Sequence, residues 1–247
     1  MKSLFKMTWI ETKLFFREPV GTFFTLAFPL MMLFIFGSIF GNTPSAYFNG
    51  YGSVDVSVPA YTAMIIATTG LVGLTITISS YREKGVLRRL QTTPMSPLYI
   101  LTAQVIVLFA MTILGMALLI IVGKLVYNLR FDGNALSMLG GFTLSSLSFF
   151  AIGFILAGLM PSARTAQIVA MVLLYPMLFL SGAGYPRELL PESILKVSAF
   201  LPLTYVVKLL RGLWIGESWG LHTTDALVLA GILVVGVLVS IKTFRWE

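Results

Sequence analysis

The sequence predicts an all-α integral membrane protein with six transmembrane helices, and three observations carry this prediction. Of the 247 residues, 57% are hydrophobic and the mean hydropathy is +0.91, whereas soluble domains are roughly 45–50% apolar. Six apolar runs lack charges in their interiors, and a helix needs about 20 such residues to cross a bilayer. The runs lack the alternation of barrel strands, so each is expected to be a helix that satisfies its own backbone.

The expected elements follow one another without a domain boundary, so residues 1–247 form a single transmembrane domain. The first run begins too late and is too long for a signal peptide core, which makes it a retained span. The spans are expected near residues 21–40, 59–80, 99–123, 137–160, 165–182 and 225–241. The expected division is an interface helix at 1–20, spans one to five within 21–182, an extracytoplasmic re-entrant region at 183–224, and span six with a cytoplasmic tail at 225–247.

The distribution of basic residues predicts the orientation. If both termini are inside, eleven of the 17 Lys and Arg residues fall in cytoplasmic segments, as the positive-inside rule requires. The expected location is therefore the inner (cytoplasmic) membrane of a bacterial cell, with several passes and both termini in the cytoplasm. The net charge of +7 is accounted for by lipid and topology, so no nucleic-acid partner is expected.

Residues 2–18 form an amphipathic stretch whose charges sort by sign at about 100° per residue. The lysines and Arg17 lie in one stripe, which predicts a short helix in the cytoplasmic interface with its basic stripe toward the headgroups. Glu11 and Glu18 share a line on nearly the opposite side, and anionic headgroups would repel them. These two acids are therefore expected to face a protein partner.

The segment at 183–224 is too apolar for an ordinary loop and too interrupted for a span. Pro186, Pro191 and Pro202 divide it, and proline is well tolerated in a first helical turn. Two short amphipathic helices are expected near 188–199 and 202–214, as interfacial or re-entrant elements in the outer leaflet.

Residues for catalysis or metal binding are not found. The interiors of the predicted spans contain no charged side chain, His222 stands alone outside them, and there is no Cys. The phosphate-binding loop pattern is also absent, so ATP and Mg would have to be bound by a separate polypeptide. Thr68 and Thr75 form a polar line on the second span, which helix packing explains as well as substrate contact does.

The stretch "YREKGVLRRLQTTPMSP" at residues 81–97 concentrates charge between two apolar spans. Drawn as one helix, Glu83 lies within the apolar face, which suits a groove in a soluble partner better than a lipid surface. A loop held inside by its bases is the alternative. The apolar face comprises Val86, Leu87 and Leu90, and the bases around it are Arg82, Lys84, Arg88 and Arg89.

The same stretch resembles the cytoplasmic coupling segment of type-2 permeases of ATP-binding cassette (ABC) exporters. Two further segments are similar in register, and together with the six-span layout they cover nearly the whole chain. They are "FFREPVGTFFTLAFPLMMLFIFGSIFG", through the first span, and "LSGAGYPRELLPESILKVSAFLPLTYVVKLLRGLW", after the fifth.

The resemblance implies a six-helix permease that pairs with a second copy or a paralogue and binds two cytoplasmic ABC ATPase subunits. It assigns ATPase contact to the N-terminal helix, with Glu11 and Glu18, and to residues 82–91. It places the substrate path along spans one, two and five, at the dimer interface, and the apolar lining suits an exported amphiphile such as a drug, lipid or hydrophobic antibiotic. The candidate lining residues are Phe23, Phe28, Thr68, Thr75 and Met177.

Two other functions remain open. A membrane scaffold or sensor that anchors an ATPase or signalling partner would also need a cytoplasmic docking surface. An ion-coupled transporter is disfavoured by the lack of charge in the spans, although backbone carbonyls and hydroxyls can hold sodium.

Overall fold

The structure is a computed structural model that describes residues 2–91, 98–184, 187 and 190–243, and within these ranges it contains helices and no strand. The predicted all-α class is confirmed. The elements are α1 Lys2–Arg17, α2 Pro19–Thr22, η1 Phe23–Ala27, α3 Phe28–Phe40, η2 Ala46–Phe48, α4 Ser53–Ala67, η3 Thr68–Leu74, α5 Thr75–Glu83, α6 Val86–Gln91, α7 Leu98–Tyr127, α8 Ala135–Leu159, α9 Ala163–Leu180, α10 Glu192–Ser198, α11 Pro202–Trp214, η5 Trp219–His222 and α12 Thr223–Thr243.

In the part of the chain that the structure describes, six helical segments are long and apolar enough to cross a membrane, which confirms the predicted number of spans. They are Phe23–Phe40, Ala46–Glu83, Tyr99–Tyr127, Ala135–Leu159, Ala163–Leu180 and Trp219–Lys242. The second is much longer than predicted, because its helix α4 begins at Ser53 and continues through Pro59. All of α4 is buried, so neighbouring helices provide the packing that the sequence alone does not reveal.

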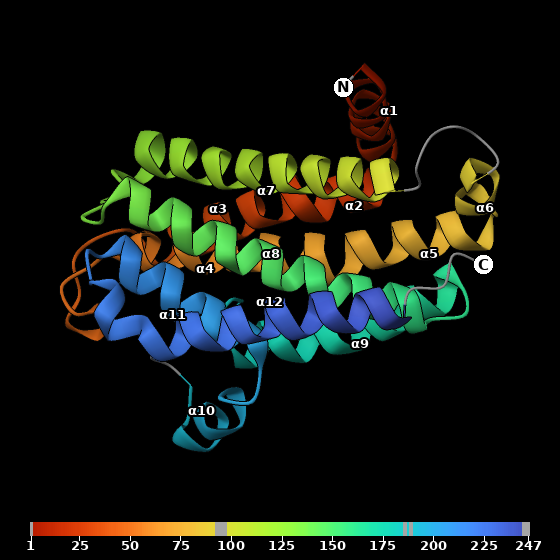
Figure 1. The fold of residues 1–247 in the computed structure, drawn as a ribbon. Coiled ribbons are helices and arrows are strands. Elements are labelled where there is room, and N and C mark those ends of the chain that lie inside the picture. The colour runs from red at the N-terminus through yellow and green to blue at the C-terminus, as the bar shows by residue number, and fades with distance from the viewer. Residues whose placement is uncertain (1, 92–97, 185–186, 188–189, 244–247) are drawn as a thin grey trace.

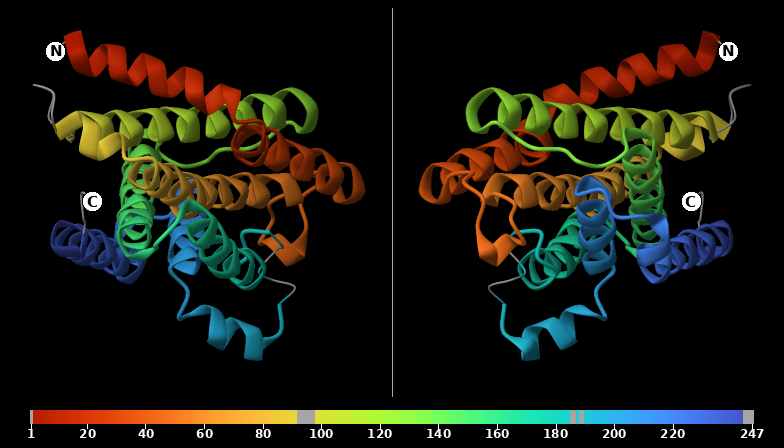
Figure 2. Two further views of the ribbon diagram at one scale, coloured as in Figure 1. Left: turned by 90° about the vertical axis from the view of Figure 1, so that its right-hand side faces the viewer. Right: turned by 90° about the vertical axis from the view of Figure 1, so that its left-hand side faces the viewer.

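The long helices run side by side, and Figure 1 shows α1 leaving this bundle at a steep angle. The end of the bundle that carries α1, α6 and the connection from α8 to α9 is called the proximal end. The other end, with η2 and residues 128–134, is called the distal end. The last turns of α12 lie toward the proximal end, as six crossings require (Figures 1 and 2).

Two π-helical stretches interrupt the first and second spans. In η1 the Phe28 amide donates to the Phe23 carbonyl, five residues back, and Pro29 directly afterwards has no amide to donate. The first span is thus loosened into a π turn just before Pro29. The second stretch, η3, contains Gly70 and Gly73. π turns inside helices are frequent at functional sites.

Close packing of η3 against α8 explains Gly70 and Gly153. A Cβ atom on Gly153 would collide with the Gly70 carbonyl oxygen, and one on Gly70 would lie 2.8 Å from Phe149 Cβ. The Thr75 hydroxyl donates to the Gly153 carbonyl at 3.2 Å. Small residues therefore let spans two and four approach backbone to backbone, as is typical of membrane helices.

The two predicted short helices after the fifth span are present as α10 and α11. Pro191 precedes the first turn of α10 and Pro202 begins α11, as the proline spacing indicates; Pro186 lies outside the described residues. The two helices are bent by 103° relative to each other. Figure 1 shows α10 away from the bundle and α11 packed within it. Nine residues of α11 are buried, Trp214 among them.

Candidate functional site

A cavity of about 980 Å³ runs along the first, second and fifth spans. These are the three spans that the sequence analysis associates with the substrate path. On the second span the lining residues Met64, Thr68, Val72, Ile76, Ser80 and Lys84 follow one another at steps of four. At 1.5 Å per residue this line covers roughly 30 Å, which is close to the thickness of a bilayer core.

The lining of the cavity changes along its length. Its distal half is apolar and includes Phe36, Met64, Leu178 and Phe179. Its proximal end is polar, because α1, α5, α7 and the residues directly after α1 and α5 contribute the side chains of Glu11, Glu18, Ser80, Tyr81, Lys84 and Gln104. The cavity is thus amphipathic along its axis.

Both π-helical stretches line this cavity. Phe24 and Thr25 come from η1, and Thr68, Thr69 and Val72 come from η3. The hydroxyls of Thr68 and Thr69 donate to carbonyls of their own helix, at 2.8 Å each. The widened turns therefore shape the cavity wall, while the Thr68 and Thr69 hydroxyls already donate hydrogen bonds to their own helix.

Of the five residues predicted to line the substrate path, Phe28 and Thr68 line this cavity and the other three do not. Thr75 is completely buried and bound to α8. It lies seven residues from Thr68, which on a regular α-helix would be the same face. The i→i+5 bonding of the intervening η3 takes more residues per turn, so the two threonines face different directions.

The other two predicted lining residues also lie elsewhere. Met177 is 8% exposed and packs in the main hydrophobic core. Phe23 is 40% exposed on the outside of the first span, with its ring 5.3 Å from that of Phe24. The cavity thus lies along the spans named for the substrate path but not along all the predicted faces, because a π turn shifts the face of one span and neighbouring helices decide the others.

The charged stretch after the second span forms two helices rather than the single helix predicted. The first, α5, ends at Glu83, and Gly85 takes a φ of 65° before α6 begins at Val86. This left-handed conformation suits glycine and ends the helix. Glu83 therefore does not share a helical face with residues 86–90. Residues 92–97, with Pro94, lie outside the described residues.

Arg82 and Glu83 bind the connection between α8 and α9 within the same chain. An Arg82 guanidinium nitrogen, Nη1, donates to the Gly158 carbonyl at 2.9 Å, and the Glu83 carboxylate accepts from the Ala163 amide at 2.8 Å. The cation thus meets the carboxyl end of α8, and the anion meets the amino end of α9, as the helix dipoles favour. Spans two, four and five are held together at the proximal end.

The remaining residues of the predicted docking face are only partly exposed. Leu87 is completely buried within the chain, so it does not project toward a partner as the helical wheel suggested. Lys84, Arg88 and Arg89 are exposed and Val86 is half-buried; the side chain of Leu90 lies outside the described residues. The exposed surface of α6 is therefore mainly basic.

Glu11 is held inside the chain rather than offered to a separate protein. It is 4% exposed, and the Tyr81 hydroxyl lies 2.8 Å and 2.7 Å from its two carboxylate oxygens. Burial raises the pKa of the Glu11 carboxyl, and the hydrogen bond from Tyr81 partly offsets this. The pair fixes α1 to the end of the second span. Glu18 is exposed at the break between α1 and α2.

Comparison with known proteins decides the family. The sequence profile of the ABC-2 type transporter family matches residues 2–214, which is most of the chain.

The chain belongs to the ABC-2 type transporter family.

Three relatives illustrate the similarity. Nodulation protein J of Rhizobium leguminosarum bv. viciae is 32% identical over 41% of this chain and 39% of its own length. A protein of Porphyra purpurea named as a transport permease, ycf38, is 22% identical over 99% of this chain and 82% of its own length. The inner membrane transport permease YhhJ of Escherichia coli K12 is 24% identical over 66% and 42%. The chain thus matches less than half the length of the first and third relatives.

Membership gives the coarse role of this ABC-2 permease. Family members are transport permease subunits that lie in the membrane and associate with ABC ATPase subunits, and they are generally not catalytic themselves. Within the described residues, no three His, Asp or Glu side chains are arranged to hold a metal ion.

At the distal end of the permease, a buried carboxylate was missed by the sequence analysis. Asp55 is completely buried at the start of α4, so the second span does contain an ionisable residue. It accepts hydrogen bonds from the Gly52 amide at 2.9 Å, from the Asn42 amide nitrogen at 2.9 Å and from the Arg130 amide at 2.8 Å. Asp55 therefore ties together three distal loops. The sequence signal for this role is the place of Asp55 at the third position of α4, where its carboxylate can cap the amino end of the helix.

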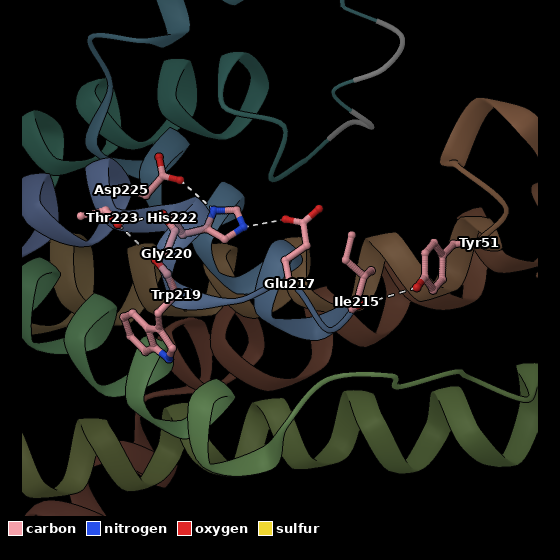
Figure 3. A network of polar contacts seen from close by, with 8 residues as sticks. All are labelled: Tyr51, Ile215, Glu217, Trp219, Gly220, His222, Thr223 and Asp225. Atoms are coloured by element: carbon pink, nitrogen blue, oxygen red, sulfur yellow. Dashed lines mark hydrogen bonds and ion pairs between the residues drawn. The ribbon is translucent and has the colours of Figure 1, made fainter.

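His222 is also not alone, contrary to expectation. Figure 3 shows its ring between two carboxylates: Nε2 lies 2.7 Å from Glu217 and Nδ1 lies 3.0 Å from Asp225. A neutral imidazole has one N–H group, so only the imidazolium form donates to both. Nearby, the Tyr51 hydroxyl donates to the Ile215 carbonyl at 3.3 Å. This cluster fastens the turn after α11 to the start of α12.

Proposed function

We propose that this ABC-2 permease is the membrane subunit of an ATP-driven exporter that moves an amphiphilic or hydrophobic substrate out of the cell. The observation that carries the proposal is the cavity of about 980 Å³, polar at its proximal end and apolar at its distal end. A pocket of this size and lining suits a drug-sized or lipid-like molecule. A scaffold would have no need for such a cavity.

The proximal end is proposed to face the cytoplasm and the ATPase subunits. It carries the exposed bases of α6 and the helix α1, which the Glu11–Tyr81 pair links to the second span. The Arg82 and Glu83 contacts connect the same region to spans four and five. A movement of α6 would thus be transmitted to the second and fifth spans, which line the cavity. ATP and Mg are bound by the partner ATPases, two per complex, and a second permease copy or paralogue completes the assembly.

The exposed surfaces of α3 and α9 support pairing with a second permease chain. Met31, Phe34 and Ile35 are each about 44–45% exposed on the first span, and Val172 and Phe179 are each 64% exposed on the fifth. Such surfaces contact either lipid or another permease copy, and they border the cavity.

Transport by purified permease and its ATPase in vesicles tests the proposal. Val72→Trp places a large ring in the cavity wall, whereas Leu238→Trp places the same ring on the outside of α12, where Leu238 is 57% exposed. We expect the first variant to lose substrate-stimulated ATP hydrolysis and transport, and the second to retain both. A complex that transports nothing and shows no stimulation with any amphiphile would favour the scaffold.

The docking surface is tested separately. Arg88→Glu reverses an exposed charge on α6, and Lys124→Glu reverses an exposed charge near the distal end of α7. We expect only Arg88→Glu to weaken ATPase binding. Equal binding by both variants would contradict a docking role for α6.

A further inference from the structure

The acceptor groups of the cavity lining gather at its proximal end. Glu11 and Glu18 are seven residues apart, so they lie on one side of the N-terminal helix and its extension, and both line the cavity. The Glu18 carboxylate lies against α2, just before the first span, since a Cβ on Gly21 would be 3.4 Å from Glu18 Oε2. Both carboxylates of the lining are therefore at the same end.

A third acceptor, Gln104 on α7, lines the cavity with its hydrogen-bonding capacity unused. Gln104 is 5% exposed, and its Oε1 atom is buried without a hydrogen-bond partner. A buried acceptor without a partner costs free energy, commonly 1–3 kcal/mol, so such groups call for an explanation. A ligand that supplies an N–H donor would satisfy it.

The charges at this end are unequal. Among the described residues, the charged ones that line the cavity are Glu11, Glu18 and Lys84; Glu18 and Lys84 are exposed, whereas Glu11 is deeply buried. The Tyr81 hydroxyl donates to Glu11 but brings no positive charge. The buried part of the proximal end therefore carries the Glu11 carboxyl group and the free acceptor of Gln104, and among the described residues none of those that line the distal half is charged.

We propose that the proximal end of the cavity binds the protonated amine of a cationic amphiphile, with the apolar tail of that molecule in the distal half. The ammonium group lies among the Glu11 and Glu18 carboxylates and donates to Gln104 Oε1. This inference rests on the proposed export function and specifies its substrate class. A primary amine fits better than a quaternary one, because only the former has an N–H to give to Gln104.

Equilibrium binding of radiolabelled dodecylammonium to the purified permease in phosphatidylcholine nanodiscs tests the site, with empty nanodiscs subtracted. Dodecyltrimethylammonium, dodecanol and dodecyl sulfate serve as competitors with the same tail. We expect dodecylammonium to bind at least roughly tenfold more tightly than dodecyl sulfate, because hydrogen bonds to charged groups contribute about 1.5–3 kcal/mol. Dodecyl sulfate binding as tightly as dodecylammonium would overturn the proposal.

Variants locate the charge recognition. Glu11→Gln/Glu18→Gln should lower dodecylammonium affinity by roughly tenfold or more, and Gln104→Leu should lower it by a smaller factor. The control is Asp132→Asn/Glu192→Gln, which removes the same charge from exposed residues outside the cavity lining. Glu18→Gln alone changes an exposed side chain and leaves the Glu11–Tyr81 pair intact. Unchanged affinity in both Glu18→Gln and the double variant would contradict the site.

Two sources of the amine are distinguished by adding phosphatidylethanolamine to the nanodiscs. Displacement of dodecylammonium by this lipid assigns the site to an aminolipid headgroup, and its retention assigns the site to a free amphiphile.

Failure of this inference differs from failure of the proposed function. If all four dodecyl compounds bind equally and Val72→Trp abolishes their binding, the cavity holds amphiphiles without charge selection, and the amine site alone is refuted. If none of them binds and Val72→Trp leaves transport unchanged, the proposed path itself is refuted.

Discussion

Tyr81→Phe should loosen the N-terminal helix from the bundle. The substitution removes one hydroxyl that lies within 2.8 Å of both oxygens of Glu11, whose side chain is 4% exposed. The ring remains, so packing changes little and the loss is confined to the hydrogen bond. A hydrogen bond to a charged group contributes about 1.5–3 kcal/mol, so the docked population of α1 should fall roughly 10- to 150-fold relative to the detached one.

Hydrogen exchange of the α1 amides in nanodiscs measures this change. We expect faster exchange across Lys2–Arg17 in Tyr81→Phe and no change in α12, which serves as the internal control. Glu11→Gln keeps a carbonyl acceptor for Tyr81 and removes the charge, so it should loosen α1 less than Tyr81→Phe. Equal protection of α1 in wild type and Tyr81→Phe would show that packing, and not this pair, holds the helix.

The same pair predicts a pH dependence with a definite sign. Because the pKa of Glu11 is raised in the docked state, docking is favoured by protonation. It should be strongest below the ordinary pKa of a glutamate, about 4.3–4.5, and should weaken as pH rises through the raised value. Tyr81, Glu18 and Lys84 line the same end of the cavity. In Glu11→Gln this part of the pH dependence of α1 exchange should disappear; a slope equal to that of the wild type would assign it to another group.

Three further variants test the packing described above, each by unfolding of the purified permease in mild detergent. Asp55→Ala should lower the free energy of unfolding by about 2–4 kcal/mol, because three donors lose a buried acceptor. A change below about 0.5 kcal/mol would contradict a stabilising role for the Asp55 hydrogen bonds. Gly153→Ala should destabilise by about 1–3 kcal/mol through collision with the Gly70 carbonyl, whereas Gly231→Ala has open space and should be neutral; similar effects would refute the close approach. Glu83→Ala should lower the free energy of unfolding by about 1 kcal/mol, because the Ala163 amide at the start of α9 loses its acceptor. Glu83→Gln should lower it by less. A larger loss in Glu83→Gln than in Glu83→Ala would contradict the contact.

Composition and periodicity were enough for the class, the number of spans and the two proline-bounded helices. These features depend on local sequence, since about 20 apolar residues or a proline at a first turn act wherever they occur. The position of Asp55 shows the limit. It precedes the predicted second span at residues 59–80, and the donors from Asn42 and Arg130, outside its own helix, allow it to be buried inside the longer span.

The cavity lies along the three spans expected to form the substrate path, but three of the five residues predicted to line that path do not line the cavity. The helical wheel assumed a regular period through residues 68–75 and 82–91, whereas a π stretch and a left-handed glycine break that period. Thr75 and Leu87 therefore point inward. Glu11 was singled out as unsuited to a lipid surface, and in the structure its partner is Tyr81. Tyr81 lies near the end of the second span, so the two side chains meet only after the chain has crossed the bundle twice.

Accessibility of a single introduced cysteine tests the central claim most directly, because the chain has no Cys of its own. Val72→Cys on the cavity wall and Leu238→Cys on the outside of α12 are labelled with a maleimide in vesicles that contain the permease and its ATPase. The account predicts that labelling at position 72 abolishes stimulated turnover, that dodecylammonium slows this labelling, and that labelling at position 238 does neither. Full turnover after complete labelling at position 72 would contradict a substrate path through this cavity.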